Sequence, residues 1–187
     1  MAYTTIDDPA QFFNTVLYTG DGNDGRTVTG VGFQPDFVWL KSRSEAEHHT
    51  LNDSVRGANN QIYSHLAYSN ATDTDRLQSF DSDGFTLGTD VIVNKNTETF
   101  VSWNWKAGTT GSGTTTGSGT GKAYSYSVNT TAGFSIVKYV GNQTAGHTIP
   151  HHLGAKPDAI LVKHLDDGQQ WATQWSPLGA TKVMRFA

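Results

Sequence analysis

The 187-residue chain contains no cysteine. Disulfides, thiolate metal sites, cysteine nucleophiles and iron–sulfur clusters are therefore excluded, and stability has to come from packing or from oligomerisation. Charged residues are also scarce, at 16% of the chain against about 25% in a typical globular protein. The 17 acidic and 13 basic residues give a net charge of -4, so no nucleic-acid partner is expected.

Long apolar runs are missing too. The sequence has no stretch of about 18 apolar residues, and residues 1–12 contain neither a basic segment nor a long apolar one. We therefore expect no membrane partner and find no secretion signal. The polar content comes from Thr, Ser, Asn and 20 Gly, a composition that favours strands and turns over helices.

Short segments rich in aromatic and β-branched residues recur about every ten residues, between clusters of Gly, Asn and Asp. This pattern predicts an all-β fold, an antiparallel β-sandwich or jelly roll. One short N-terminal helix is expected, with Asp7 or Asp8 as its cap and Pro9 as its first residue. The predicted strands are 15–18, 36–41, 49–51, 61–63, 84–87, 91–93, 99–105, 124–128, 134–139, 147–149, 159–164, 170–175 and 181–186.

The segment 99–105 alternates strictly, with Trp103 and Trp105 on one face and Ser102 and Asn104 on the other. Such alternation is typical of a strand that packs on at least one side, so this segment is predicted to be a core strand. The tryptophans expected in the core are Trp39, Trp103 and Trp105.

Residues 109–123 read TTGSGTTTGSGTGKA. A run of this kind carries too little apolar surface to offset the entropy lost on ordering. We therefore predict a Gly/Ser/Thr-rich linker or exposed loop, which separates a complete sandwich unit at 1–108 from a second unit at 124–187.

The second unit repeats part of the first. Residues 13–20, FNTVLYTG, align with 134–141, FSIVKYVG, and after one inserted residue 32–41 align with 154–163. Further matches along this second alignment are Ser54 with Ser176, Gly57 with Gly179 and Ala58 with Ala180. The first copy continues for about fifty residues beyond Gly57, whereas the second ends soon after Gly179, so 124–187 is predicted to be a partial copy.

Half a sandwich leaves an apolar sheet face uncovered, and an isolated domain does not tolerate that exposure. We expect 124–187 to pack onto the first copy, to complete a fold with a neighbouring subunit in a homo-oligomer, or to belong to a longer chain.

Five separated blocks carry a resemblance to a known domain: YTGDG at 18–22, VGFQPDFVWLK at 31–41, DSVRGA at 53–58, SFDSDGFTLG at 79–88 and WNWKAG at 103–108. In this order they resemble an uncharacterised repeated β-sandwich domain of virion structural and tail-fibre proteins of tailed phages. That domain is often compared with concanavalin A-like lectins and glucanases. The resemblance implies a location in the virion, other virion proteins as partners and a glycan of the host surface as a ligand. It supplies no catalytic residues.

Two tryptophans near the C-terminal end of the sequence are candidates for a contact surface. Trp171 and Trp175 lie four residues apart, on the same face of a regular strand, beside the polar Thr173 and Gln174. Tryptophan rings stack on sugars and are enriched in protein interfaces. The pair is therefore predicted to form a ligand site or an interface.

Oxygen-rich loops give a second, weaker candidate, since such loops can hold Ca²⁺. The residues concerned are Asp21, Asn23, Asp24, Asp81 and Asp83. Gly84 falls two places too early for an EF-hand loop, and turn formation is the favoured explanation of these residues. No cofactor other than this possible Ca²⁺ is expected.

Catalytic motifs are absent: the three glutamates, Glu45, Glu47 and Glu98, do not form the glucanase pattern, and neither a Gly-x-Ser-x-Gly motif nor a phosphate-binding loop occurs. We expect no enzyme. The predicted function is a fibre or tail-appendage subunit that contributes to host attachment. The alternatives are a capsid decoration or adaptor subunit and, third, a polysaccharide-degrading enzyme.

Overall fold

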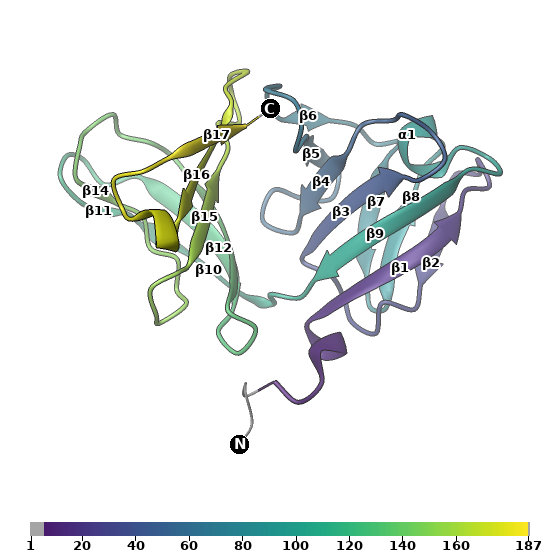
Figure 1. Cartoon of the computed structure of the whole chain (residues 1–187), viewed down its shortest axis with the longest axis horizontal. Coiled ribbons are helices and arrows are strands. Elements are labelled where there is room, and N and C mark those ends of the chain that lie inside the picture. The colour runs from purple at the N-terminus through teal and green to yellow at the C-terminus, as the bar shows by residue number, and fades with distance from the viewer. Residues whose placement is uncertain (1–5, 187) are drawn as a thin grey trace.

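The computed structural model describes residues 6–186, and its architecture is all-β, as predicted (Figure 1). Two units lie side by side: an N-terminal unit, residues 6–108, and a C-terminal unit, residues 109–186. Residues 1–5 of the first predicted unit and Ala187 of the second lie outside the described residues.

The N-terminal unit is a sandwich of two antiparallel sheets. The large sheet has the order β1-β9-β3-β4-β5-β6, and the small sheet has the order β2-β8-β7. The strands of the large sheet are β1 (Phe13–Thr19), β9 (Thr99–Trp105), β3 (Phe37–Ser42), β4 (Thr50–Asp53), β5 (Asn60–Ile62) and β6 (Ala71–Thr72). Those of the small sheet are β2 (Arg26–Thr29), β8 (Gly84–Leu87) and β7 (Leu77–Asp81).

The main core lies between these two sheets. Val38 and Leu40 of β3 pack there with Phe100 of β9 against Phe85 and Leu87 of β8. All five side chains are buried, because alternation along each strand directs every second residue into the sandwich.

Trp39, Trp103 and Trp105 were predicted to lie in the core, but they lie outside this main core, and only Trp39 packs against a second hydrophobic cluster, around Trp171. They are half-buried and lie on the opposite face of the large sheet, while Ser102 and Asn104 point into the sandwich and are fully buried. Asn104 Nδ2 donates to Ser102 Oγ at 3.0 Å and to the Asn14 carbonyl at 3.1 Å. These bonds satisfy the donors that burial would otherwise leave unpaired, so a polar pair can occupy the core side.

The helical segments differ from the prediction in one place. The expected N-terminal helix is a 3-10 turn, η1 (Pro9–Gln11), and Asp8 caps it by accepting from the Ala10 N–H at 3.1 Å. The segment predicted as strand 91–93 forms a short helix, α1 (Val91–Asn94), instead. Asp90 caps this helix through the Ile92 N–H at 2.8 Å, and the cap outweighs the strand preference of the β-branched residues.

The C-terminal unit contains three small antiparallel sheets, with the orders β10-β12-β13, β11-β14 and β15-β16-β17. A 3-10 turn, η2 (Ser176–Leu178), follows β16. The strands are β10 (Thr109–Thr114), β11 (Thr116–Gly117), β12 (Ala123–Asn129), β13 (Phe134–Tyr139), β14 (His147–Thr148), β15 (Ala159–Val162), β16 (Trp171–Trp175) and β17 (Met184–Phe186).

The predicted linker is therefore corrected, because most of residues 109–117 form strands. All six residues of β10 pair with β12, and in this register Gly111 lies opposite Tyr126 and Gly113 opposite Tyr124. A Cβ on Gly111 would lie 2.6 Å from the Tyr126 hydroxyl, so the tyrosine ring occupies the space above the glycine. Cross-strand aromatic cover supplies the apolar contact that the Gly-rich segment lacks.

Several hydrogen bonds recur at aligned positions of the two units. The Ser54 N–H donates to the Asp36 carbonyl at 2.8 Å, and the Ser176 N–H donates to the Asp158 carbonyl at 2.7 Å. The Lys41 ammonium donates to the carbonyls of Ser42 and Glu45, as the Lys163 ammonium does to those of His164 and Gln169. The partial second copy stays a prediction, and these matching bonds support it.

The C-terminal unit packs onto the N-terminal unit. Trp171 of β16 packs against Leu51 and Ile62, and its Nε1 donates to the Tyr63 carbonyl at 2.7 Å. Elsewhere in this contact between the two units, which we call the seam, the Phe134 ring lies 6.1 Å from the Trp105 ring, measured between centroids, and nearly parallel to it.

Candidate binding face

The predicted tryptophan pair is divided between two environments. Trp171 is only 5% exposed, because it lies in the contact between the two units. Trp175, at the other end of β16, is 46% exposed. Only Trp175 can therefore meet an external ligand without a rearrangement of the units.

The first oxygen-rich loop, between β1 and β2, is occupied by internal bonds. Asp21 accepts from the Asn23 N–H at 2.9 Å and pairs with Arg26 at 2.7 Å. The backbone N–H of Asn23, and then the bond from Arg26, hold the pKa of Asp21 below its usual value. Asp24 accepts from Gln78 Nε2 at 2.7 Å, and so it joins this loop to β7.

The second loop, between β7 and β8, is built in the same way. Asp81 accepts from the hydroxyls of Ser79 and Thr86, and Asp83 accepts from the backbone N–H groups of Gly32 and Gly30. These two N–H groups lower the pKa of Asp83. Within residues 6–186 no group of three or more His, Asp or Glu side chains is arranged to hold a metal ion. Calcium binding at either loop stays a prediction.

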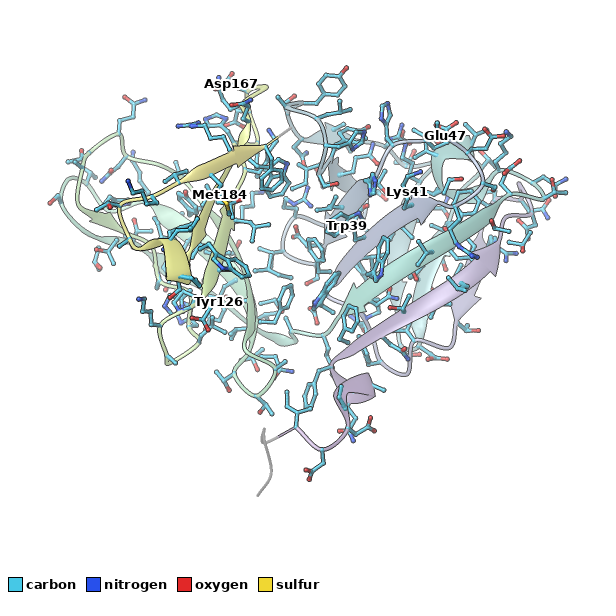
Figure 2. The ribbon with its side chains drawn as sticks, in the orientation of Figure 1. Trp39, Lys41, Glu47, Tyr126, Asp167 and Met184 are labelled. Carbon is cyan, nitrogen blue, oxygen red and sulfur yellow. The ribbon has the colours of Figure 1, made fainter. Side chains whose placement is uncertain are left out.

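The clearest surface feature is the aromatic face, which we define as Phe13, Phe37, Trp39, Trp103 and Trp105. In the register of the large sheet Trp105 lies beside both Phe13 and Phe37, and Trp103 lies beside Trp39. The Trp39 and Trp103 rings meet edge to face with centroids 5.7 Å apart, and the Phe13 and Trp105 centroids are 4.8 Å apart. Figure 2 shows Trp39 on the side of the sheet turned toward the C-terminal unit.

This face was missed as a site because tryptophans in an apolar strand were assigned to the core. The signal was nevertheless present: the alternation of 99–105 placed Trp103 and Trp105 on one face with polar residues on the other. Sequence alone did not show which of the two faces meets the small sheet.

Histidines border the aromatic face. Trp39 Nε1 donates to His49 Nδ1 at 2.9 Å, so neutral His49 carries its proton on Nε2. His48 Nδ1 and His65 Nε2 share a proton across 2.9 Å. Burial, together with neighbouring positive charge, lowers the pKa of His49 and His65. Both rings are therefore neutral at pH 7 and offer hydrogen-bonding groups rather than charge.

A sequence family described as a domain of unknown function, DUF7483, matches residues 8–187. The chain belongs to this family. No curated protein and no solved structure matches it.

The DUF7483 match spans both units, and residues of both units line one pocket at the seam between them. This pocket has a volume of about 600 Å³, and Gln34, Lys106, Ser125 and Tyr126 are among its lining residues. The volume lies within the range of small-molecule sites.

Asp36, which also lines the pocket, joins the two units of this DUF7483 chain. Its carboxylate accepts from the hydroxyls of Ser54 at 2.7 Å and Ser127 at 3.1 Å and from the Ala107 N–H at 2.8 Å. Because both oxygens are engaged, Asp36 holds the seam together.

Among the described residues no helix is long and apolar enough to cross a membrane.

Proposed function

We propose that this DUF7483 protein is a non-enzymatic structural subunit of a tailed-phage virion, in a fibre or tail appendage. In this proposal it contributes to host attachment by binding a glycan of the host surface. The virion context comes from the resemblance of the five sequence blocks. The binding role is supported by the β-sandwich and by the aromatic face.

One observation carries the glycan proposal: three tryptophans lie side by side on one face of the large sheet, although Trp39 also packs against the cluster around Trp171 and Trp105 also stacks on Phe134. Sugar rings present apolar C–H faces that stack on such aromatic rings, and the sheet holds the rings in place, which reduces the entropy lost on binding. Trp39, Trp103 and Trp105 are only half-buried, so part of each ring remains accessible.

A sugar also needs partners for its hydroxyl groups. His49 lies at the border of the aromatic face, where its ring centroid is 5.8 Å from that of Trp39. The bond from Trp39 leaves the His49 proton on Nε2, which is a donor suited to a hydroxyl oxygen. Trp103 would then be the stacking platform, and His49 would supply a directional contact.

Glycan-array screening of the purified chain, followed by titration calorimetry on the best glycan, tests this proposal. We expect Trp103→Ala to weaken binding at least about tenfold, which corresponds to the loss of one stacking ring. Trp175→Ala is the matched control, because that tryptophan is exposed on the other unit, and it should leave the affinity unchanged. Circular dichroism verifies that both variants fold. Absence of any glycan binding, or equal binding by Trp103→Ala, would contradict the proposal.

A second candidate, a capsid decoration or adaptor subunit, is favoured by the apolar side chains exposed on the C-terminal unit. These include Ile160, Leu161, Val162, Val183 and Met184. Patches of this kind are typical of surfaces that assemble with other proteins. Stoichiometric binding to capsids without any glycan binding would favour this second function.

A further inference from the structure

The N-terminal unit shows how one strand joins two others in this fold. Strand β9 lies between β1 and β3 in the large sheet and runs antiparallel to both. The sequence repeat aligns β1 with β13 and β3 with β15. In the C-terminal unit β13 and β15 are each the edge strand of a separate sheet.

The free edge of β13 corresponds to the edge of β1 that β9 fills. The Gly20 N–H donates to the Glu98 carbonyl, so the even-numbered residues of β1 direct their backbone groups to β9. Their aligned partners in β13 are odd-numbered, Val137 among them. The Val140 N–H donates to the Ala123 carbonyl, so the even-numbered residues of β13 face β12. The odd-numbered residues of β13 therefore face the side without a paired strand.

Strand β15 has the same arrangement. The Arg43 N–H donates to the Thr99 carbonyl, which shows that the odd-numbered residues of β3 face β9. The Ser176 N–H donates to the Asp158 carbonyl, so the even-numbered residues of β15 face β16. The odd-numbered residues, including Leu161, present their backbone groups to the open side.

Side-chain burial differs in the same way. Val38 and Leu40 of β3 are 0% and 1% exposed, whereas the aligned Ile160 and Val162 of β15 are 43% and 36% exposed. These are the side chains that an added strand and its covering layer would shield from water.

The geometry points to a strand-addition site between β13 and β15. We infer that it takes one extended segment of another polypeptide, antiparallel to both strands, which uses backbone hydrogen bonds for affinity and alternate side chains for specificity. The flanking side chains are apolar on both faces of the site, with Val137 and Ile160 on one face and Ile136 and Leu161 on the other. The occupant is therefore a strand with apolar residues on both faces, as β9 has in Phe100 and Val101.

A different polypeptide fits this site better than a second copy. Every strand in residues 6–186 is already paired within the chain, so a second copy could supply a strand only by breaking one of its own sheets. Strand addition would use the backbone groups of β13 and β15, whereas glycan binding would use the ring faces of the aromatic face, even though Phe134 of β13 packs against Phe37 and Trp105. Strand addition and glycan binding can thus be tested and can fail separately.

The test uses a fluorescent peptide of residues 98–106, ETFVSWNWK, as the probe. Added to the full chain, it should bind saturably and should slow hydrogen exchange at the backbone amides of Val137 and Leu161. The control is a peptide of the same sequence that is N-methylated at Val101 and Trp103, because it has the same side chains but cannot donate those hydrogen bonds. Equal binding of both peptides, or no saturation with the unmodified one, would overturn the inference.

A matched pair of variants gives a second readout. Leu161→Pro removes a donor that faces the open side and leaves the bonds to β16 intact, a position in an edge strand where proline is tolerated. We expect it to fold normally and to weaken peptide binding about tenfold, whereas Leu161→Val binds normally. Val137→Pro tests the same donor role from β13 if Leu161→Pro does not fold. Self-association of the unmodified chain that Leu161→Pro abolishes would overturn the choice of a different polypeptide, since the occupant would be a second copy.

Discussion

The two units contain aligned sequence segments but differ in what covers them. In the N-terminal unit the apolar side chains of β3 are sealed by β9 and by the small sheet, whereas the aligned residues of β15 are exposed. A run of apolar residues is therefore enough to define a strand in both units. Burial of that strand depends on the layer that packs on it, which only the N-terminal unit contains within the described residues.

The loop after β4 sharpens the comparison. In the N-terminal unit Asp53 and Arg56 form a buried ion pair, with Arg56 also bonded to Asn70. The aligned positions in the C-terminal unit are Trp175 and Leu178, which are both exposed. The C-terminal unit thus presents apolar side chains to the surroundings where the N-terminal unit has a closed polar network.

The largest effect is expected from breaking that ion pair. Arg56→Ala leaves the Asp53 carboxylate buried without its partner and should lower the free energy of unfolding by about 3–5 kcal/mol, measured by urea denaturation. The aligned substitution Leu178→Ala should change it by less than about 0.5 kcal/mol. Similar losses for the two variants would contradict the difference between the units.

The second largest effect is expected at the contact between the two units. Trp171→Ala removes a buried ring and the bond to Tyr63, and should cost about 3 kcal/mol in chemical denaturation. Trp175→Ala, on the same strand, serves as the control and should cost less than about 0.5 kcal/mol. A Trp171→Ala chain as stable as the unmodified one would show that the units do not depend on this contact.

The aligned residues Leu40 and Val162 test directly how burial contributes to stability. Leu40→Ala should lower the free energy of unfolding by about 2–3 kcal/mol, because it leaves a cavity between the two sheets. At the aligned position Val162→Ala should cost less than about 1 kcal/mol, since that side chain is already partly in water. Thermal unfolding of both variants checks this, and a Val162→Ala cost as large as that of Leu40→Ala would mean that β15 is covered in solution.

The Gly-rich strand is expected to give a smaller effect. Tyr126→Ala removes the ring above Gly111 and should cost about 1 kcal/mol, with faster hydrogen exchange confined to β10 and β12. Tyr139→Ala, on β13 opposite Tyr124, is a control that leaves the Tyr126 ring above Gly111 in place. Unchanged exchange in β10 would argue against the tyrosine cover as the reason that this segment forms a strand.

The smallest expected effect is a loss of stability at acidic pH. Since the pKa values of His49 and His65 are lowered by folding, their contribution to stability is complete above the unfolded value of about 6.5 and is lost as the pH falls through the folded values. Urea midpoints should therefore drop between about pH 7 and about pH 5. Replacing both histidines by glutamine should flatten this dependence, and a dependence as steep as before would assign it to other groups.

Three strands were predicted to the residue: β9 from its strict alternation, and β8 and β13 from aromatic and β-branched residues bounded by turn residues. Short or polar strands were missed: β2 pairs with the distant β8, and β6 and β7, which pair with the strands next to them in the sequence, contain too few apolar residues to mark a strand. Strand β10 was missed for the related reason that its stabilising contacts come from the tyrosines of β12. In each case the deciding interaction is pairing with another strand, and the segment itself has no apolar pattern that reveals it.

The candidate site was only partly predictable. Trp171 and Trp175 were correctly placed on one strand, but only the packing of the units shows that Trp171 is covered. The aromatic face required knowledge of which side of β9 meets the small sheet. The buried Ser102 and Asn104 reverse the usual expectation, since hydrogen bonds satisfy their donors inside the core.

Residue-resolved amide exchange, measured by NMR on the full chain, compares the aligned amides of Trp39 and Leu161 most directly. The Trp39 N–H lies on the side of β3 that β9 fills, whereas the Leu161 N–H faces the open side of β15. We predict that the Trp39 amide exchanges at least about a thousandfold more slowly than the Leu161 amide, while the Ile160 amide is protected. Equal protection of Trp39 and Leu161 would contradict an open strand position in the C-terminal unit.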